Sequence, residues 1–193
     1  NFAYIPKGWE ANVPAGLDYV HITTNNTIYG TQIKNDPSVN TWLAADMSSD
    51  ILCRPIDVSK YGIIYAGAQK NIGTSGATLV IVKDELLGKV TRPIPTILNY
   101  KTHIENDSMF NTPSTVAVYT CLKSLEWVKS IGGISTIQKL NYEKAKFTGL
   151  NNVLITNLII ASSINKDSIL YIDNIQLKIK LYSLFLSKIH INS

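Results

Sequence analysis

Lys70 is the residue whose placement in this sequence most readily suggests chemistry. It closely follows the apolar run 62–67 and precedes a loop that contains Gly73 and Gly76. A lysine at the carboxyl end of a buried strand lies where open α/β sheets bind ligands, and it can act there as a nucleophile or a base. A solvated loop lysine is the ordinary alternative, and a phosphate loop is excluded because the order GxxxxGK[ST] is absent.

Two further places offer polar groups that complement a lysine. Asp46 ends the apolar run 41–45, where a carboxylate is either a loop or cap residue or a buried anion that holds a positive charge on a cofactor. Asn111 and Thr112 precede Pro113 at a predicted helix start, which offers donors to an anion as well as an ordinary cap. A carboxylate, an amine and donors for a phosphate are together the groups that pyridoxal 5'-phosphate requires.

The elements that must position these residues can be predicted from periodicity. Short apolar and β-branched runs predict strands over 18–23, 41–46, 62–67 and 77–82. The last two are nearly all apolar, as in strands covered on both faces. A helix is predicted from a cap at Asn111 or Thr112 to Gly132 and Gly133, and a second helix from Ile134 to about Phe147. Buried strands followed by helices predict an α/β fold with a mainly parallel sheet and flanking helices.

Composition narrows the class of protein. The chain has 193 residues, 45% of them hydrophobic, which is enough for one core. Its 18 basic and 14 acidic side chains are scattered, so we expect no nucleic-acid partner, and no apolar run is long enough to predict a membrane span. Cys53 and Cys121 predict a reduced, cytoplasmic protein without a structural metal, and His21 and His103 are interpreted as structural or surface residues.

Motifs at four places in the chain resemble one family. The segments 44–58 (AADMSSDILCRPIDV) and 65–73 (YAGAQKNIG) closely resemble signatures of the phosphoserine aminotransferases, class V aminotransferases that depend on pyridoxal phosphate. The segments 25–30 (NNTIYG) and 108–113 (SMFNTP) resemble the same family, in the same order. The resemblance covers roughly residues 2–147 and implies a partial large domain of the fold type I pyridoxal-phosphate transferases.

The resemblance implies a role for each matching residue near the cofactor. Lys70 would bind pyridoxal 5'-phosphate covalently and then move a proton during the reaction. Asp46 would keep the pyridine nitrogen protonated, Thr27 would hydrogen-bond the phenolic oxygen, and Gln69 would contact the phosphate. Asn111 and Thr112 would reach across a homodimer interface to the cofactor phosphate of the partner.

The reaction implied is amino transfer from glutamate to 3-phosphohydroxypyruvate, which gives 2-oxoglutarate and phosphoserine. It serves serine biosynthesis, and often pyridoxine synthesis as well. Departures from the family lead us to expect a fragment or defective copy that is inactive alone. Thr74 and Ser75 stand where the family usually has proline and alanine, and counterparts of its N-terminal third and C-terminal small domain are not recognisable.

The chain is accordingly divided into two predicted parts. Residues 1–148 form the central portion of the large domain, and residues 149–193 form an atypical tail that does not match the family; residues 151–193 contain no Gly, Pro, Arg or Glu. Two alternatives remain open at this point. One is another fold type I pyridoxal-phosphate enzyme, and the other is a non-catalytic interaction protein that keeps the scaffold and pairs with a full-length partner.

Overall fold

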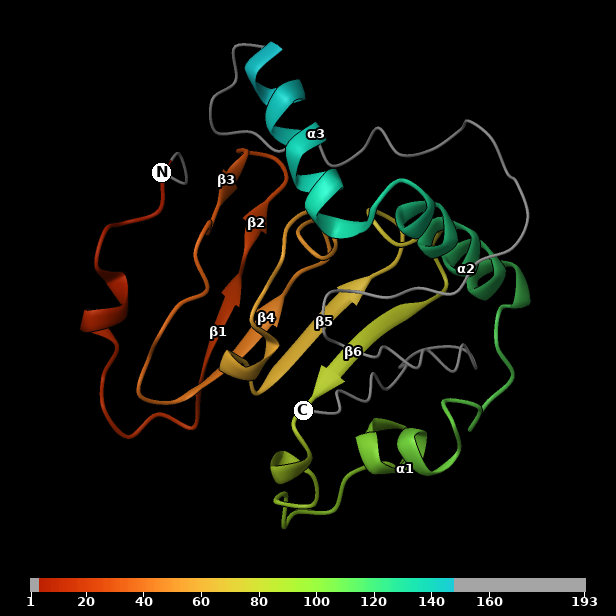
Figure 1. Cartoon of the computed structure of the whole chain (residues 1–193). Helices are drawn as coiled ribbons and strands as arrows, with labels where there is room; N and C mark the ends of the chain where they lie inside the picture. Colours follow the sequence, from red (N-terminus) through yellow and green to blue (C-terminus); the bar gives the residue numbers. More distant parts are fainter. Residues whose placement is uncertain (1–3, 148–193) are drawn as a thin grey trace.

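A mixed four-stranded sheet forms the centre of the chain (Figure 1). The computed structural model describes residues 4–147, so the tail predicted over 149–193 lies outside the described residues. The strand order is β1-β4-β5-β6, in which β1, β4 and β5 are parallel and β6 is antiparallel to β5. The strands of the sheet are β1 (Tyr19–Thr23), β4 (Trp42–Asp46), β5 (Ile63–Gly67) and β6 (Thr78–Val82). The four predicted strands and the mainly parallel sheet are confirmed.

A small antiparallel hairpin follows β1 and was not predicted. Its strands are β2 (Asn25–Asn26) and β3 (Thr31–Gln32), and they pair Asn25 with Gln32 and Asn26 with Thr31. The backbone N–H of Gly30 donates to the carbonyl of Asn26 at 2.8 Å, which closes the turn between them. The left-handed φ of 64° at Gly30 suits a glycine at this turn.

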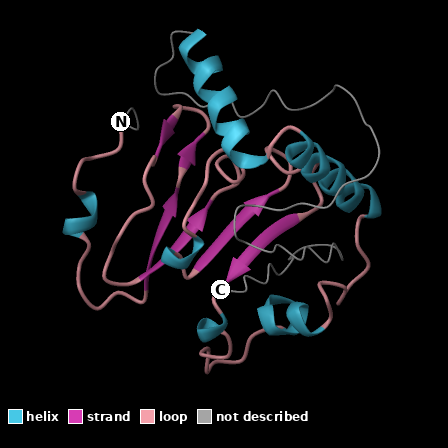
Figure 2. Cartoon of the chain, in the orientation of Figure 1, coloured by secondary structure: helices cyan, strands magenta, loops and turns pink. Residues whose placement is uncertain are grey.

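The two predicted α-helices lie after the strands, a shorter α-helix that was not predicted precedes them, and short 3-10 turns are spread along the chain (Figure 2). The α-helices are α1 (Tyr100–Glu105), α2 (Thr115–Ser130) and α3 (Gly133–Phe147), and the 3-10 turns are η1 (Trp9–Asn12), η2 (Val58–Lys60), η3 (Asp84–Leu86) and η4 (Thr96–Leu98). Within the described residues no helix is long and apolar enough to cross a membrane.

The start of α2 corrects the predicted helix cap. Ser114, not Asn111 or Thr112, caps the helix, since its side chain accepts a hydrogen bond from the N–H of Ala117. Pro113 therefore precedes the cap instead of taking the first helical position, and Asn111 and Thr112 belong to the segment before the helix. The predicted break between α2 and α3 is confirmed at Gly132, where φ is 104°.

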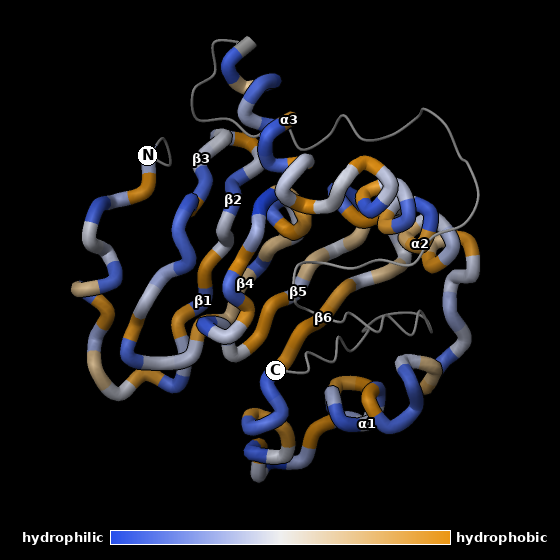
Figure 3. The backbone as a smooth tube through the Cα atoms, viewed as in Figure 1, coloured by the Kyte–Doolittle hydropathy of each residue, from blue (hydrophilic) through white to orange (hydrophobic). Residues whose placement is uncertain are grey.

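One face of the sheet carries most of its buried residues. The buried positions alternate along the strands and include Ile22, Leu43, Ala45, Ile64 and Ala66. Cys121 of α2 belongs to the same core cluster, so α2 packs on that side. Figure 3 shows β5 and β6 as largely hydrophobic, but residues such as Ile63 and Tyr65 on the other face are only half-buried. Val80 of β6 lies on the same face as Tyr65 and is buried, so among the described residues the prediction that both faces of these strands are covered holds in part.

Candidate functional site

Asp46 is the last residue of β4, at the carboxyl end of a strand between two parallel neighbours. Its position in the ladder is opposite Thr23 of β1 and Tyr65 of β5. The half-buried carboxylate accepts a hydrogen bond from the N–H of Ser48 at Oδ1, 2.9 Å away. Its main-chain carbonyl accepts from the N–H of Thr24 at 3.0 Å. Both the backbone and the side chain of Asp46 are therefore held in place.

Lys70 lies in the turn that follows β5 and meets Thr27, which lies in the turn between β2 and β3. The Lys70 Nζ donates to Thr27 Oγ1 at 2.9 Å, across 43 residues of sequence. Because β1, β4 and β5 are parallel, the segments that follow them meet at the same edge of the sheet. The fold thus brings an amine and a hydroxyl together at the edge where the carboxylate of Asp46 ends the middle strand.

Gln69 is exposed, and its amide folds back over the end of β5. A Cβ atom added to Gly67 would lie only 2.6 Å from Gln69 Oε1 and 2.9 Å from Nε2. A glycine at position 67 therefore makes room for the amide that the resemblance places on the cofactor phosphate.

Asn111 and Thr112 lie in the segment that joins α1 to α2. The Asn111 side-chain amide donates to the carbonyl of Thr112 at 3.4 Å, and its Oδ1 is buried without a hydrogen-bond partner among the described residues. No hydrogen bond within residues 4–147 links this pair to Lys70 or Asp46. One copy of the chain thus brings Lys70, Thr27 and Asp46 to one edge, but it gives Asn111 and Thr112 no bond to them.

His21 and Tyr65 form a pair that the sequence reasoning missed. The His21 Nε2 lies 2.8 Å from the Tyr65 hydroxyl, and the two rings stack with centroids 6.0 Å apart. Burial and the nearby charge of Asp46 raise the pKa of Tyr65. Strand alternation could have found this pair, because His21, Asp46 and Tyr65 occupy positions of the same parity on one sheet face. His103, in contrast, is buried and bonded to the carbonyl of Ile97, which confirms a structural role.

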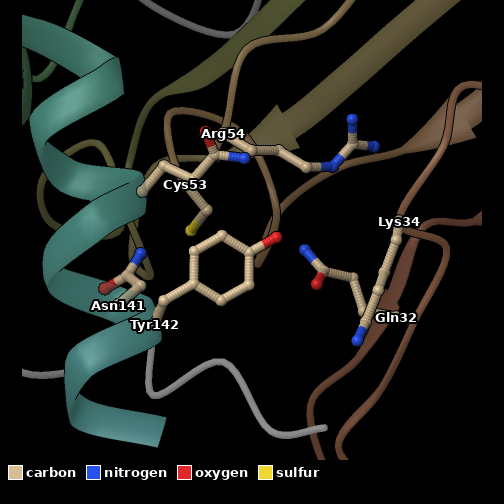
Figure 4. Close-up of a pocket in the computed structure, with 7 residues that line it drawn as sticks. Gln32, Lys34, Cys53, Arg54, Asn141 and Tyr142 are labelled. Atoms are coloured by element: carbon tan, nitrogen blue, oxygen red, sulfur yellow. The ribbon is translucent and has the colours of Figure 1, made fainter. Parts of the chain in front are cut away.

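A small hollow lies between α3 and the hairpin (Figure 4). It is lined by Gln32, Lys34, Cys53, Arg54, Gln138, Asn141 and Tyr142. None of the predicted cofactor residues is among them, so this hollow is distinct from the edge that holds Lys70. Among residues 4–147, no group of three His, Cys, Asp or Glu side chains could hold a metal ion.

Comparisons with known proteins agree with the motifs. The family model described as aminotransferase class-V matches residues 5–191. The curated phosphoserine aminotransferase of Azobacteroides pseudotrichonymphae is 58% identical over 147 residues, which is 76% of this chain and 40% of that protein. The phosphoserine aminotransferase of Porphyromonas gingivalis is 57% identical over 145 residues, again 40% of its length. The chain therefore spans about two fifths of these relatives.

Solved structures show the same likeness in three dimensions. A phosphoserine aminotransferase studied for radiation damage of its Schiff base matches with a TM-score of 0.72 and 50% identity, over 77% of this chain and 41% of that one. The pyridoxal-phosphate-bound phosphoserine aminotransferase of Trichomonas vaginalis matches with a TM-score of 0.66 and 33% identity, over 70% of this chain and 40% of that one. The resemblance inferred from the motifs and the predicted fold class are both confirmed.

Proposed function

The chain belongs to the class-V aminotransferase family, and on this premise we propose that it contributes the lysine-bearing part of the pyridoxal 5'-phosphate site of a phosphoserine aminotransferase. The observation that carries the proposal is the 2.9 Å contact between Lys70 Nζ and Thr27 Oγ1 at the sheet edge where Asp46 ends β4. The sequence identity to phosphoserine aminotransferases, which is 58% over 147 residues in one case, supports the same assignment.

The residues present fit this cofactor chemically. Its aldehyde needs an amine, its phenolic oxygen a hydroxyl or amine donor, and its ring nitrogen an anion. Lys70 and Thr27 offer the first two side by side. Asp46 uses Oδ1 for the N–H of Ser48, and its Oδ2 has no hydrogen-bond partner among the described residues, so that oxygen is available to a ring N–H. Gln69 is exposed, and its amide lies at the end of β5, where a phosphate could accept from it.

Each residue has a defined task in the proposed reaction. The cofactor, when bound, supplies a ring that withdraws electrons from the substrate α-carbon. Asp46 holds the proton on the ring nitrogen, because a carboxylate favours the charged form of its partner. Thr27 orients the phenolic oxygen, and Lys70 Nζ takes the proton from the substrate α-carbon as a general base.

The proposed substrates are glutamate and the phosphorylated three-carbon keto acid 3-phosphohydroxypyruvate, and the products are 2-oxoglutarate and phosphoserine. This places the reaction in serine biosynthesis. We propose the cytoplasm as its location, because Cys53 and Cys121 are both free and buried, as is usual where thiols stay reduced.

A homodimer is part of the proposal. Asn111 and Thr112 make no bond to the site of their own copy, and large apolar side chains near them are exposed. These side chains are Met109 (46% exposed), Phe110 (43%), Val116 (72%) and Tyr119 (55%). Such a patch next to the polar pair suits a protein interface. Replacement of Val116 by glutamate is expected to shift the sedimentation coefficient from that of a dimer to that of a monomer.

Titration with the cofactor tests the proposed site. Pyridoxal 5'-phosphate is added to the purified chain, and the absorbance change that marks its covalent bond to an amine is followed to saturation. We expect one equivalent to bind, and we expect Lys70→Ala to abolish this phase while Lys60→Ala, at an exposed lysine after β4, leaves it intact. A dimer that never develops this absorbance would instead favour the non-catalytic interaction protein.

A further inference from the structure

The turn that follows Asp46, residues 47–54, forms hydrogen bonds to the segments that hold Asp46, Thr27 and Lys70. Ser48 donates its N–H to the Asp46 carboxylate and accepts, at its Oγ, the N–H of Gly67 at 3.0 Å. The carbonyl of Ile51 accepts from the side-chain amide of Asn71 at 2.9 Å, next to Lys70. We call residues 47–54 the support turn, because it connects the end of β4 to the segment that follows β5.

The support turn also holds both ends of the hairpin that presents Thr27. At the start of the hairpin, Asn25 Nδ2 donates to Ser49 Oγ at 2.8 Å, and Ser49 Oγ donates to the Asn25 carbonyl at 2.9 Å. At its end, Gln32 Nε2 donates to Asp50 Oδ1 at 2.5 Å. Only six residues, 26–31, lie between these two anchors, and the turn that contains Thr27 is among them.

Asp50 is fixed in turn by a buried ion pair. Its side chain is fully buried, and its Oδ2 accepts from Arg54 Nη2 at 3.1 Å. The Arg54 Nη1 also pairs with Asp36 Oδ1 at 3.0 Å. Figure 4 shows Gln32 and Arg54 on the hairpin side of the hollow, opposite Asn141 and Tyr142 of α3. A buried carboxylate with two good partners has little freedom, so the group that Gln32 reaches is rigid.

We propose that Gln32 and Asp50 are positioning residues for the cofactor site, because they clamp the hairpin so that Thr27 Oγ1 stays within reach of Lys70 Nζ. The proposal rests on the proposed function. Neither residue touches Lys70; they act through the hairpin and determine where its hydroxyl lies. Loss of the clamp frees the hairpin locally while the sheet and the core remain.

The test compares two variants that separate the clamp from general stability. Gln32→Met keeps the length of the side chain and leaves both ion pairs of Arg54 in place, but it removes the hydrogen bond to Asp50. Asp36→Asn is the matched control. It weakens one of the two ion pairs of Arg54, but the Asp36 side chain forms no hydrogen bond to the hairpin. The free energy of unfolding of both variants is measured first. If Asp36→Asn is the less stable of the two, a change in hydrogen exchange or in cofactor attachment that is seen only in Gln32→Met cannot result from a general loss of stability.

Amide hydrogen exchange of the hairpin is the first readout. It follows the N–H of Gly30, bonded to Asn26 O, and the N–H of Ile33, bonded to Thr24 O at 2.7 Å. A hydrogen bond to a charged group is strong enough that its loss should speed local exchange about tenfold or more. We expect this increase in Gln32→Met and not in Asp36→Asn. Exchange within about twofold of wild type in Gln32→Met, or an equal increase in Asp36→Asn, would overturn the positioning role.

The second readout is the share of pyridoxal 5'-phosphate that borohydride fixes on Lys70 and not on other lysines. We expect Gln32→Met to reduce this share and Asp36→Asn to keep it. An unchanged share in Gln32→Met would overturn the positioning role. If the wild-type chain itself shows no preference for Lys70, the proposed function fails and the cofactor role of the clamp with it, while hydrogen exchange still reports whether the clamp holds the hairpin.

Discussion

Replacement of Arg54 by methionine should destabilise the fold strongly, because this guanidinium pairs with two carboxylates in the interior. The Arg54 side chain is 7% exposed, and its partners Asp36 and Asp50 are 12% and 0% exposed. Burial alone would lower the pKa of Arg54, but Asp50 and Asp36 outweigh it, so the pKa is raised and the group stays charged. The methionine would leave both carboxylates without their cation.

The expected cost follows from this burial. Removal of one partner from a buried ion pair costs about 3–5 kcal/mol, since the remaining charge is left buried without a counter-ion and away from water. The free energy of unfolding of an ordinary domain is only about 5–15 kcal/mol, so Arg54→Met would remove a large part of it.

The chain offers a control pair with the same spacing and a different environment. Lys101 and Glu105 are also four residues apart, with 3.6 Å between Nζ and Oε1, but both side chains are 61% exposed. Exposed pairs contribute only about 0–1 kcal/mol, so Lys101→Met should change little. If Arg54→Met loses much more stability than Lys101→Met, the cause of the difference is the burial of the Arg54 ion pairs, because both variants remove an ion pair.

Urea unfolding followed by circular dichroism measures both variants. The midpoint of Arg54→Met should fall far below that of the wild type at a similar slope, and Lys101→Met should unfold near the wild type. If the two variants lose the same free energy within about 1 kcal/mol, the reasoning that assigns the Arg54 cluster a structural role is refuted.

The remaining predictions concern a close packing contact and two titrating groups. Gly73→Ala should cost about 1–3 kcal/mol in urea unfolding, because the new Cβ would lie 2.9 Å from Cys121 Sγ and 3.0 Å from its backbone nitrogen; a loss below about 0.5 kcal/mol would contradict the packing of α2 on this loop. Asp46→Asn should lower the pKa of Tyr65, since Asp46 is one of the charges that raise it, and an unchanged ultraviolet titration of Tyr65 would show that the two do not interact. Burial, with the charge of Asp50, raises the pKa of Cys53 from 9.0 to about 12, so at pH 8 this thiol should be alkylated about a thousandfold more slowly than an ordinary one, and fast alkylation of the folded chain would be the contrary result.

The four sheet strands could be predicted because each is a short apolar run with a clear end. The hairpin from Asn25 to Gln32 could not, since its strands are two residues long and polar, and contacts with Ser49 and Asp50 hold it instead of local preference. The start of α2 was predicted too early because Asn111 and Thr112 are also good capping residues, and only the geometry selects Ser114.

Some residues of the candidate site could also be predicted from the sequence, and others could not. Asp46 and Lys70 could be placed at one edge because both follow buried strands and the carboxyl ends of parallel strands meet there. Thr27 followed only from the family resemblance, because nothing local distinguishes it from other threonines. The roles of Gln32 and Asp50 depend on contacts between distant segments, which no periodicity in the sequence encodes.

The most direct test of the central claim is the site of covalent cofactor attachment. Pyridoxal 5'-phosphate is added to the purified chain, the bond is reduced with borohydride, and the modified lysine is identified by peptide mass. We expect stoichiometric modification of Lys70 that is lost in Lys70→Ala and weakened in Asp46→Ala. Modification scattered over surface lysines, and unaffected by either substitution, would contradict it.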